Sequence, residues 1–371
     1  MIDAKSHISI LLHESKKIEL GRPEKAILIE QAVQLADAHN EIELAYNARQ
    51  ELVKACYFSG QPDKAIVAFS WCLAQHDKHP GKFDEWLLMW TYKWIIEAVI
   101  KFPQIPLTKI DELVEDATRR FEPFEGGLRA LYELRTGHYH HIGLTQQAER
   151  TYEQWQEAPC GVYGSRTGLS NCHACEILDE VMHKFFCGRY AEGIDAAAPV
   201  LAQRVTCLST GKVIFASVLV PLVRLGELDR ARTYHQTGYR LISTNMTFLE
   251  FIACHINYAT IVNKLEDAVK MFGKHLEWAL EAVTLTDVFD FYLASRLLFT
   301  RLKEKKEHVT LRLPKTFPIR QDSGRYDVQA LIVWLDEQLH SIAAKFDERN
   351  KTDRFSGRID KSAELQALFL P

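Results

Sequence analysis

Stretches in which apolar residues recur at helical spacing alternate along the chain with short breaks that contain glycine and proline. The clearest breaks are GRPEKAI at 21–27 and GQPDKAI at 60–66, which lie 39 positions apart. Glycine suits the left-handed residue just past a helix end, and proline suits the first turn of a helix, where its missing N–H is not needed. Each motif therefore predicts a turn between two helices.

Looser copies of this motif continue the pattern, with gaps of 39, 83, 45, 38 and 37 residues between turns. The gap of 83 is about twice the others and holds one more unit, in which an apolar helix over 84–101 and the break FPQIPL at 102–107 precede a helix capped by Thr108. Residues 1–285 are therefore predicted to form about seven antiparallel helix pairs. The predicted turns lie near Gly21, Gly60, Pro103, Gly143, Gly188, Gly226 and Asn263.

These motifs resemble the tetratricopeptide repeat (TPR) family, whose second helix carries a glycine, an alanine five residues on, an aromatic residue four later and a small residue three later. Gly60, Ala65, Phe69 and Cys72 follow this pattern, and Gly143, Ala148 and Tyr152 follow it with Trp155 at the last position. The resemblance covers about three quarters of the chain, with a period longer than the usual 34 residues. It implies an all-α, right-handed α-solenoid of TPR-like repeats whose first helices line a concave surface.

A second resemblance rests on the cysteines Cys172, Cys175 and Cys207 together with LVRLGELDRAR and AAKFDERNKTDRF. These segments are similar to uncharacterised bacterial repeat proteins. This similarity implies a bacterial TPR-like protein and no particular activity.

The region 286–371 is predicted to be a helical cap, because the last unit of a repeat array would otherwise expose apolar surface. Its predicted segments are, in order, a helix over 287–305, an irregular basic loop over 304–325 with a short strand at 309–313, a long helix over 326–349, a polar and mobile stretch over 350–360, and a short helix over 363–370. The basic loop is either a solvated segment or a surface for an acidic partner.

Composition narrows the function further. The chain carries 45 Lys and Arg against 49 Asp and Glu, a formal net charge of −4, which is unlike the basic surface of a nucleic-acid-binding protein. We find neither a signal-peptide pattern nor an apolar run long enough to span a membrane. Eight cysteines without a secretory signal favour reduced thiols and a cytoplasmic location.

No catalytic signature is found: the sequence has no phosphate-binding glycine loop, nucleophile elbow or HExxH motif. The histidines His138, His140 and His141 precede a predicted turn, where a helix dipole favours them. No catalytic residue is assigned, and the protein is predicted not to be an enzyme.

The predicted function is a scaffold or regulatory adaptor that binds another protein or a peptide on its concave surface. By repeat phase, the predicted groove residues are Asn47, Lys54, Tyr57, Trp86 and Trp90. The two tryptophans are also consistent with core packing between helices. A peptide-sensing regulator that changes conformation, or an all-helical enzyme with an unrecognised site, are the alternatives. The partner and the oligomeric state stay open.

Four cysteines are candidate metal ligands. Cys172 and Cys175 form a CxxC pair at a predicted helix start, and antiparallel packing brings Cys207 to the same edge. The preceding unit ends near Cys160, so four thiolates could complete a tetrahedral structural zinc site, with His173 also available. Ordinary packing of free thiols and redox pairing are the other interpretations. No other cofactor is predicted.

Overall fold

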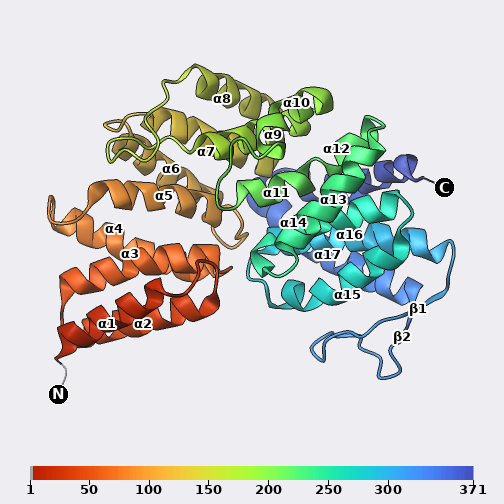
Figure 1. Ribbon diagram of the computed structural model, residues 1–371, viewed down its shortest axis with the longest axis horizontal. Coiled ribbons are helices and arrows are strands. Elements are labelled where there is room, and N and C mark those ends of the chain that lie inside the picture. The colour runs from red at the N-terminus through yellow and green to blue at the C-terminus, as the bar shows by residue number, and fades with distance from the viewer. Residues whose placement is uncertain (1–2, 371) are drawn as a thin grey trace. The chain divides into compact units, whose positions relative to one another are not determined.

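The computed structural model describes residues 3–370, which are helical apart from connecting segments and one small hairpin (Figure 1). The chain divides into two compact units. The first comprises the chain up to Leu134 together with Gln154–Ser170, and the second comprises Arg135–Glu153 and the chain from Asn171 onward. No helix in the described part of the chain is both long and apolar enough to cross a membrane.

Helices up to α8 follow the predicted pairs. Their bounds are α1 Ala4–Lys16, α2 Pro23–Ala38, α3 Ile42–Phe58, α4 Pro62–Lys78, α5 Glu85–Val99, α6 Leu107–Phe121, α7 Gly127–Ile142 and α8 Thr145–Glu157. The repeat positions of α4 are buried: the small Ala65 and Cys72 let the paired helices approach closely, and the large ring of Phe69 fills the space between them. Helices α1 to α6 each pack on their neighbours in sequence, and residues of α1 to α6 and of the first half of α7 form one core.

The later helices complete the pairs and add a C-terminal region. Their bounds are α9 His173–Phe186, α10 Tyr190–Leu201, α11 Thr210–Ser217, α12 Leu219–Arg224, α13 Leu228–Ile242, α14 Leu249–Ile261, α15 Leu265–Glu281, α16 Leu285–Lys303, α17 Val328–Asn350 and α18 Arg354–Lys361. Short 3-10 helices lie at Met246–Phe248 and Ser362–Leu368. The strands β1, His308–Thr310, and β2, Arg325–Asp327, form an antiparallel hairpin.

All seven predicted turns are confirmed. Gly60 has φ 78° directly after α3, and Pro62 is the first residue of α4. Asn263 reaches φ 62° in the corresponding turn before α15, because asparagine tolerates the left-handed region better than most residues. The predicted cap at Thr108 is wrong: α6 begins at Leu107 with Pro106, in extended backbone, as its N-cap.

One predicted first helix is interrupted. The apolar stretch before Gly226 forms α11 and α12, which break at Val218. Pro221 has no N–H to offer the carbonyl of Ser217 four residues earlier, and its ring crowds that carbonyl. The chain therefore restarts its helix at Leu219.

The C-terminal region shares its core with the repeats. Residues of α14, α15, α16 and α17 join one buried cluster, so the boundary predicted at residue 285 lies inside the second unit. The mobile stretch predicted over 350–360 is wrong, because it contains α18. Both carboxylate oxygens of Asp347 accept hydrogen bonds at the start of that helix, from the N–H groups of Phe355 at 2.8 Å and Ser356 at 2.9 Å. Phe355 is buried and stacks on Phe346 with ring centroids 4.3 Å apart.

Candidate binding face and thiol cluster

The first helices α1, α3 and α5 share a solvent-facing side in the first unit, which we call the first-helix face. On α3 the helical period points Asn47, Glu51 and Lys54 outward, while Ala48 and Leu52 are buried. A cavity of about 230 Å³ lies on this face. It is lined by Leu12, Ser15, Lys16, Asn47, Gln50, Glu51 and Leu87. Of the predicted groove residues, Asn47 therefore borders an open depression and Lys54 is exposed beside it.

Tyr57 lies further along the same helix and is held by α5. Its hydroxyl donates a hydrogen bond to Oε2 of Glu97 at 2.5 Å, and its ring stacks on Trp94 with centroids 5.6 Å apart. Burial raises the pKa of the Glu97 carboxyl above its ordinary value. Tyr57 is half-buried, so only part of its side chain is open to solvent.

Trp86 and Trp90 stack on one another with ring centroids 5.3 Å apart, as their spacing on α5 requires. Both are half-buried beneath a loop of the same unit. The indole Nε1 of Trp86 donates to the carbonyl oxygen of Gly168 at 2.8 Å. Nζ of Lys93 lies 3.5 Å from the centroid of the Trp90 ring and donates to the carbonyl oxygen of Leu169 at 2.7 Å. Successive backbone carbonyls are thus bound by side chains of a first helix.

The loop that supplies these carbonyls, residues 159–170, is held by backbone hydrogen bonds to Glu125. The N–H of Glu125 donates to Thr167 O, and the N–H of Leu169 donates to Glu125 O, both at 2.9 Å. Gly126, with φ 65°, allows the close approach, because a Cβ there would lie 2.1 Å from Oγ of Ser170. The helical pattern of the sequence does not indicate this loop. The glycines at 161, 164 and 168 are the signal of close backbone packing that could have revealed it.

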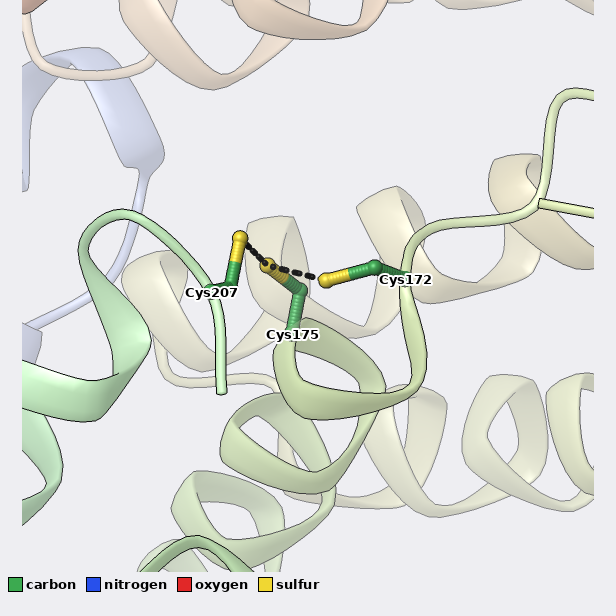
Figure 2. Close-up of side chains that lie close together, drawn as sticks. All are labelled: Cys172, Cys175 and Cys207. Carbon is green, nitrogen blue, oxygen red and sulfur yellow. Dashed lines mark hydrogen bonds between the residues drawn. The ribbon is translucent and has the colours of Figure 1, made fainter. Parts of the chain in front are cut away.

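Three predicted metal ligands meet in the second unit (Figure 2). Cys172 is the N-cap of α9, Cys175 lies in its first turn, and Cys207 lies in the segment between α10 and α11. The Sγ of Cys175 is 3.3 Å from that of Cys172 and 3.7 Å from that of Cys207. Figure 2 shows Cys175 between the other two, with the three sulfur atoms pointing toward one another. The antiparallel return of α10 brings Cys207 back to the start of α9, as the sequence predicted.

The thiols are half-buried and electrostatically linked. Hydrogen bonds from the thiols of Cys172 and Cys175 lower the pKa of Cys207, whereas the same sulfur contacts raise the pKa of Cys175. Oγ1 of Thr210 lies 3.4 Å from the sulfur of Cys175.

Of the two additional ligand candidates from the sequence, His173 lies in the second unit but is not one of the three donors of this group. Cys160 belongs to the first unit, where it is exposed and its Sγ donates to Gly161 O at 3.3 Å. Its role as a fourth ligand stays a prediction. His173 is exposed at the start of α9.

A second group of potential ligands, which the sequence analysis missed, lies at the other end of α9. Oε2 of Glu149 is 2.9 Å from Nε2 of His183 and 3.2 Å from Sγ of Cys187. The guanidinium of Arg189 reaches both oxygens of Glu149 at 3.1 Å and lies 3.0 Å from Nε2 of His183. Arg189 therefore already supplies the positive charge that a metal cation would bring, and this group is a structural ion-pair network.

A larger cavity, of about 800 Å³, borders the start of α15 and strand β1. The charged residues that line it, among them Lys264, Glu266 and Asp267, are exposed. Catalytic sites instead gather ionisable groups in enclosed pockets. This cavity therefore resembles an open surface more than a catalytic pocket.

No protein-family model matches the chain, and no curated protein matches it. The likeness to TPR proteins therefore stays a hypothesis, based on the repeated motifs. The function is inferred from the two sites described above.

Proposed function

We propose that this protein is a peptide- or protein-binding scaffold of the TPR type, whose helix pairs are the repeats of a right-handed solenoid. The binding surface is the first-helix face of the first unit. The observation that carries the proposal is the capture of two successive backbone carbonyls, those of Gly168 and Leu169, by Trp86 and Lys93 of α5. A surface that holds main-chain groups in this way suits extended peptides of varied sequence.

The cavity of about 230 Å³ on the first-helix face offers a partner matching chemistry. Leu12 and Leu87 provide apolar contact, and the amide of Asn47 can both donate to and accept from a peptide backbone. Lys16 and the exposed Lys54 favour a carboxylate on the ligand. We therefore expect an extended segment that presents free backbone groups and an acidic residue or a C-terminus.

A peptide-sensing regulator is the second candidate, and the loop 159–170 favours it. The loop covers Trp86 and Trp90 in the manner of a ligand. A peptide that binds more tightly than the loop would displace it from α5. The displaced loop would carry Val162 and Tyr163, which are 66% and 57% exposed, away from their present positions. Binding and loop displacement would then be coupled.

Peptides selected from a random displayed library against the full chain should bind the first-helix face. Replacing Asn47 and Lys54 together with Ala is expected to weaken a selected peptide at least about tenfold, or about 1.4 kcal/mol. Isothermal titration calorimetry measures the affinity. Gln34→Ala, an exposed change on α2, is the matched control and should leave binding unchanged. Equal affinity for all three proteins, or a selection that yields no binder, would refute the proposed face.

A further inference from the structure

We infer that Cys172, Cys175 and Cys207 bind one divalent cation of the zinc class, with the fourth coordination position left to an exogenous ligand. The sulfur geometry supports this. Zinc–thiolate bonds of about 2.3 Å in a tetrahedron place neighbouring sulfur atoms about 3.8 Å apart. The observed sulfur–sulfur distances of 3.3 and 3.7 Å lie close to this value, and all three sulfurs fall within 4.8 Å of one another.

The donor set selects the kind of ion. Three sulfur atoms without a carboxylate form a soft site, which prefers zinc and its heavier relatives to calcium or magnesium. A dication would also allow all three thiols to ionise, because its charge offsets the repulsion between neighbouring thiolates. The hydroxyl of Thr210, 3.4 Å from Cys175, is placed to donate a hydrogen bond to the bound thiolate and orient it.

The topology gives such an ion a structural role in the second unit. Cys175 and Cys207 are 32 residues apart in sequence and come from two segments of different structure, a helix start and a connecting segment. The connection from Ala202 to Ser209 has Gln203 in the left-handed region at φ 54° and contains no helix. An ion shared by both segments would tie this connection to α9. The fourth position, on the half-exposed side of the cluster, stays accessible to water or a small thiol ligand.

Titration with Co(II), which replaces zinc in thiolate sites and absorbs visible light, tests the inference on the full reduced chain. We expect saturation at about one equivalent, with thiolate-to-cobalt charge-transfer absorption, and full displacement by Zn(II). Replacing Cys207 with Ser should lower the Zn(II) affinity by more than the roughly 10-fold to 100-fold that loss of an outer partner costs. Circular dichroism of the variant without metal, and the same titration of Cys175→Ser, separate loss of a ligand from loss of folding.

Cys187→Ser is the matched control, because Cys187 belongs to the ion-pair network around Arg189. This variant should bind Co(II) and Zn(II) as the unmodified chain does. The inference is overturned if Cys187→Ser loses the metal while Cys207→Ser keeps it. It is equally overturned if the reduced chain binds neither ion, or if the absorption shows oxygen and nitrogen ligands only.

Discussion

Lowering the pH from about 6.5 to about 4.5 is expected to destabilise the second unit by several kcal/mol, because histidines are buried there without charge. His138, His255 and His275 are at most 7% exposed. Burial lowers the pKa of His138 to about 4, that of His275 to about 3, and that of His255 well below its ordinary value. In each ring one nitrogen has no hydrogen-bond partner among the described residues. No acceptor there would therefore stabilise the N–H that protonation creates.

Stability falls as the pH falls because unfolding is accompanied by proton uptake. A histidine whose pKa falls on folding binds fewer protons in the folded chain, so its contribution is intact above pH about 6.5 and is lost as the pH falls toward the folded value. Each pH unit in that window costs about 1.4 kcal/mol per histidine, and two units cost about 2 to 3 kcal/mol. Neighbouring cations reinforce the effect, since Arg135 and Arg349 lower the pKa of His138 and Lys274 lowers that of His275.

Urea unfolding at several pH values measures this loss. In the variant His138→Leu the slope of stability against pH should fall by about 1.4 kcal/mol per unit between pH 6.5 and 4.5. His39 is exposed, and His39→Leu should keep the slope of the unmodified chain. An unchanged slope in His138→Leu would show that the ring is already protonated in the folded protein.

Lys93→Met is expected to destabilise the first unit by about 3 kcal/mol and to release the loop 159–170. Lys93 is 1% exposed, and its ammonium group donates to Leu169 O. Methionine keeps the apolar stem but removes a charged hydrogen bond worth about 1.5 to 3 kcal/mol, and it leaves a buried carbonyl without that donor. The contact with Trp90 adds a cation–π interaction worth about 0.5 to 2 kcal/mol.

Two measurements separate the parts of this prediction. Urea unfolding reports the loss of stability, and hydrogen–deuterium exchange reports whether amides of residues 161–170 exchange faster. Lys78→Met, an exposed change on α4, is the control and should alter neither. Lower stability with unchanged exchange in the loop would mean that other contacts hold it on α5.

The helix pairs could be predicted because their signals are local. A glycine just past a helix end and a proline in the next first turn, as at Gly60 and Pro62, constrain the backbone wherever they occur. The approach of Cys207 to Cys172 and Cys175 was also predictable, since antiparallel helices return the chain to the same edge. That step needed only the order and length of two helices.

The covered face of α5 could not be predicted, because its partners are backbone atoms. Lys93 and Leu169 are 76 residues apart, and a carbonyl acceptor leaves no mark in the side-chain pattern. The helix α18 escaped for a related reason. Its sequence is polar, but Asp347 caps it from a preceding helix and Phe355 anchors it. Tertiary hydrogen bonds thus outweigh the composition that suggested a mobile segment.

Site-specific photo-crosslinking tests the proposed binding face most directly. A photoreactive residue at position 47 on α3 is predicted to capture a library-selected peptide in high yield. The same residue at position 34 on α2, which is also exposed, should capture almost none. Capture at position 34 equal to that at position 47, or none at position 47 by a peptide that binds, would contradict peptide recognition by the first helices.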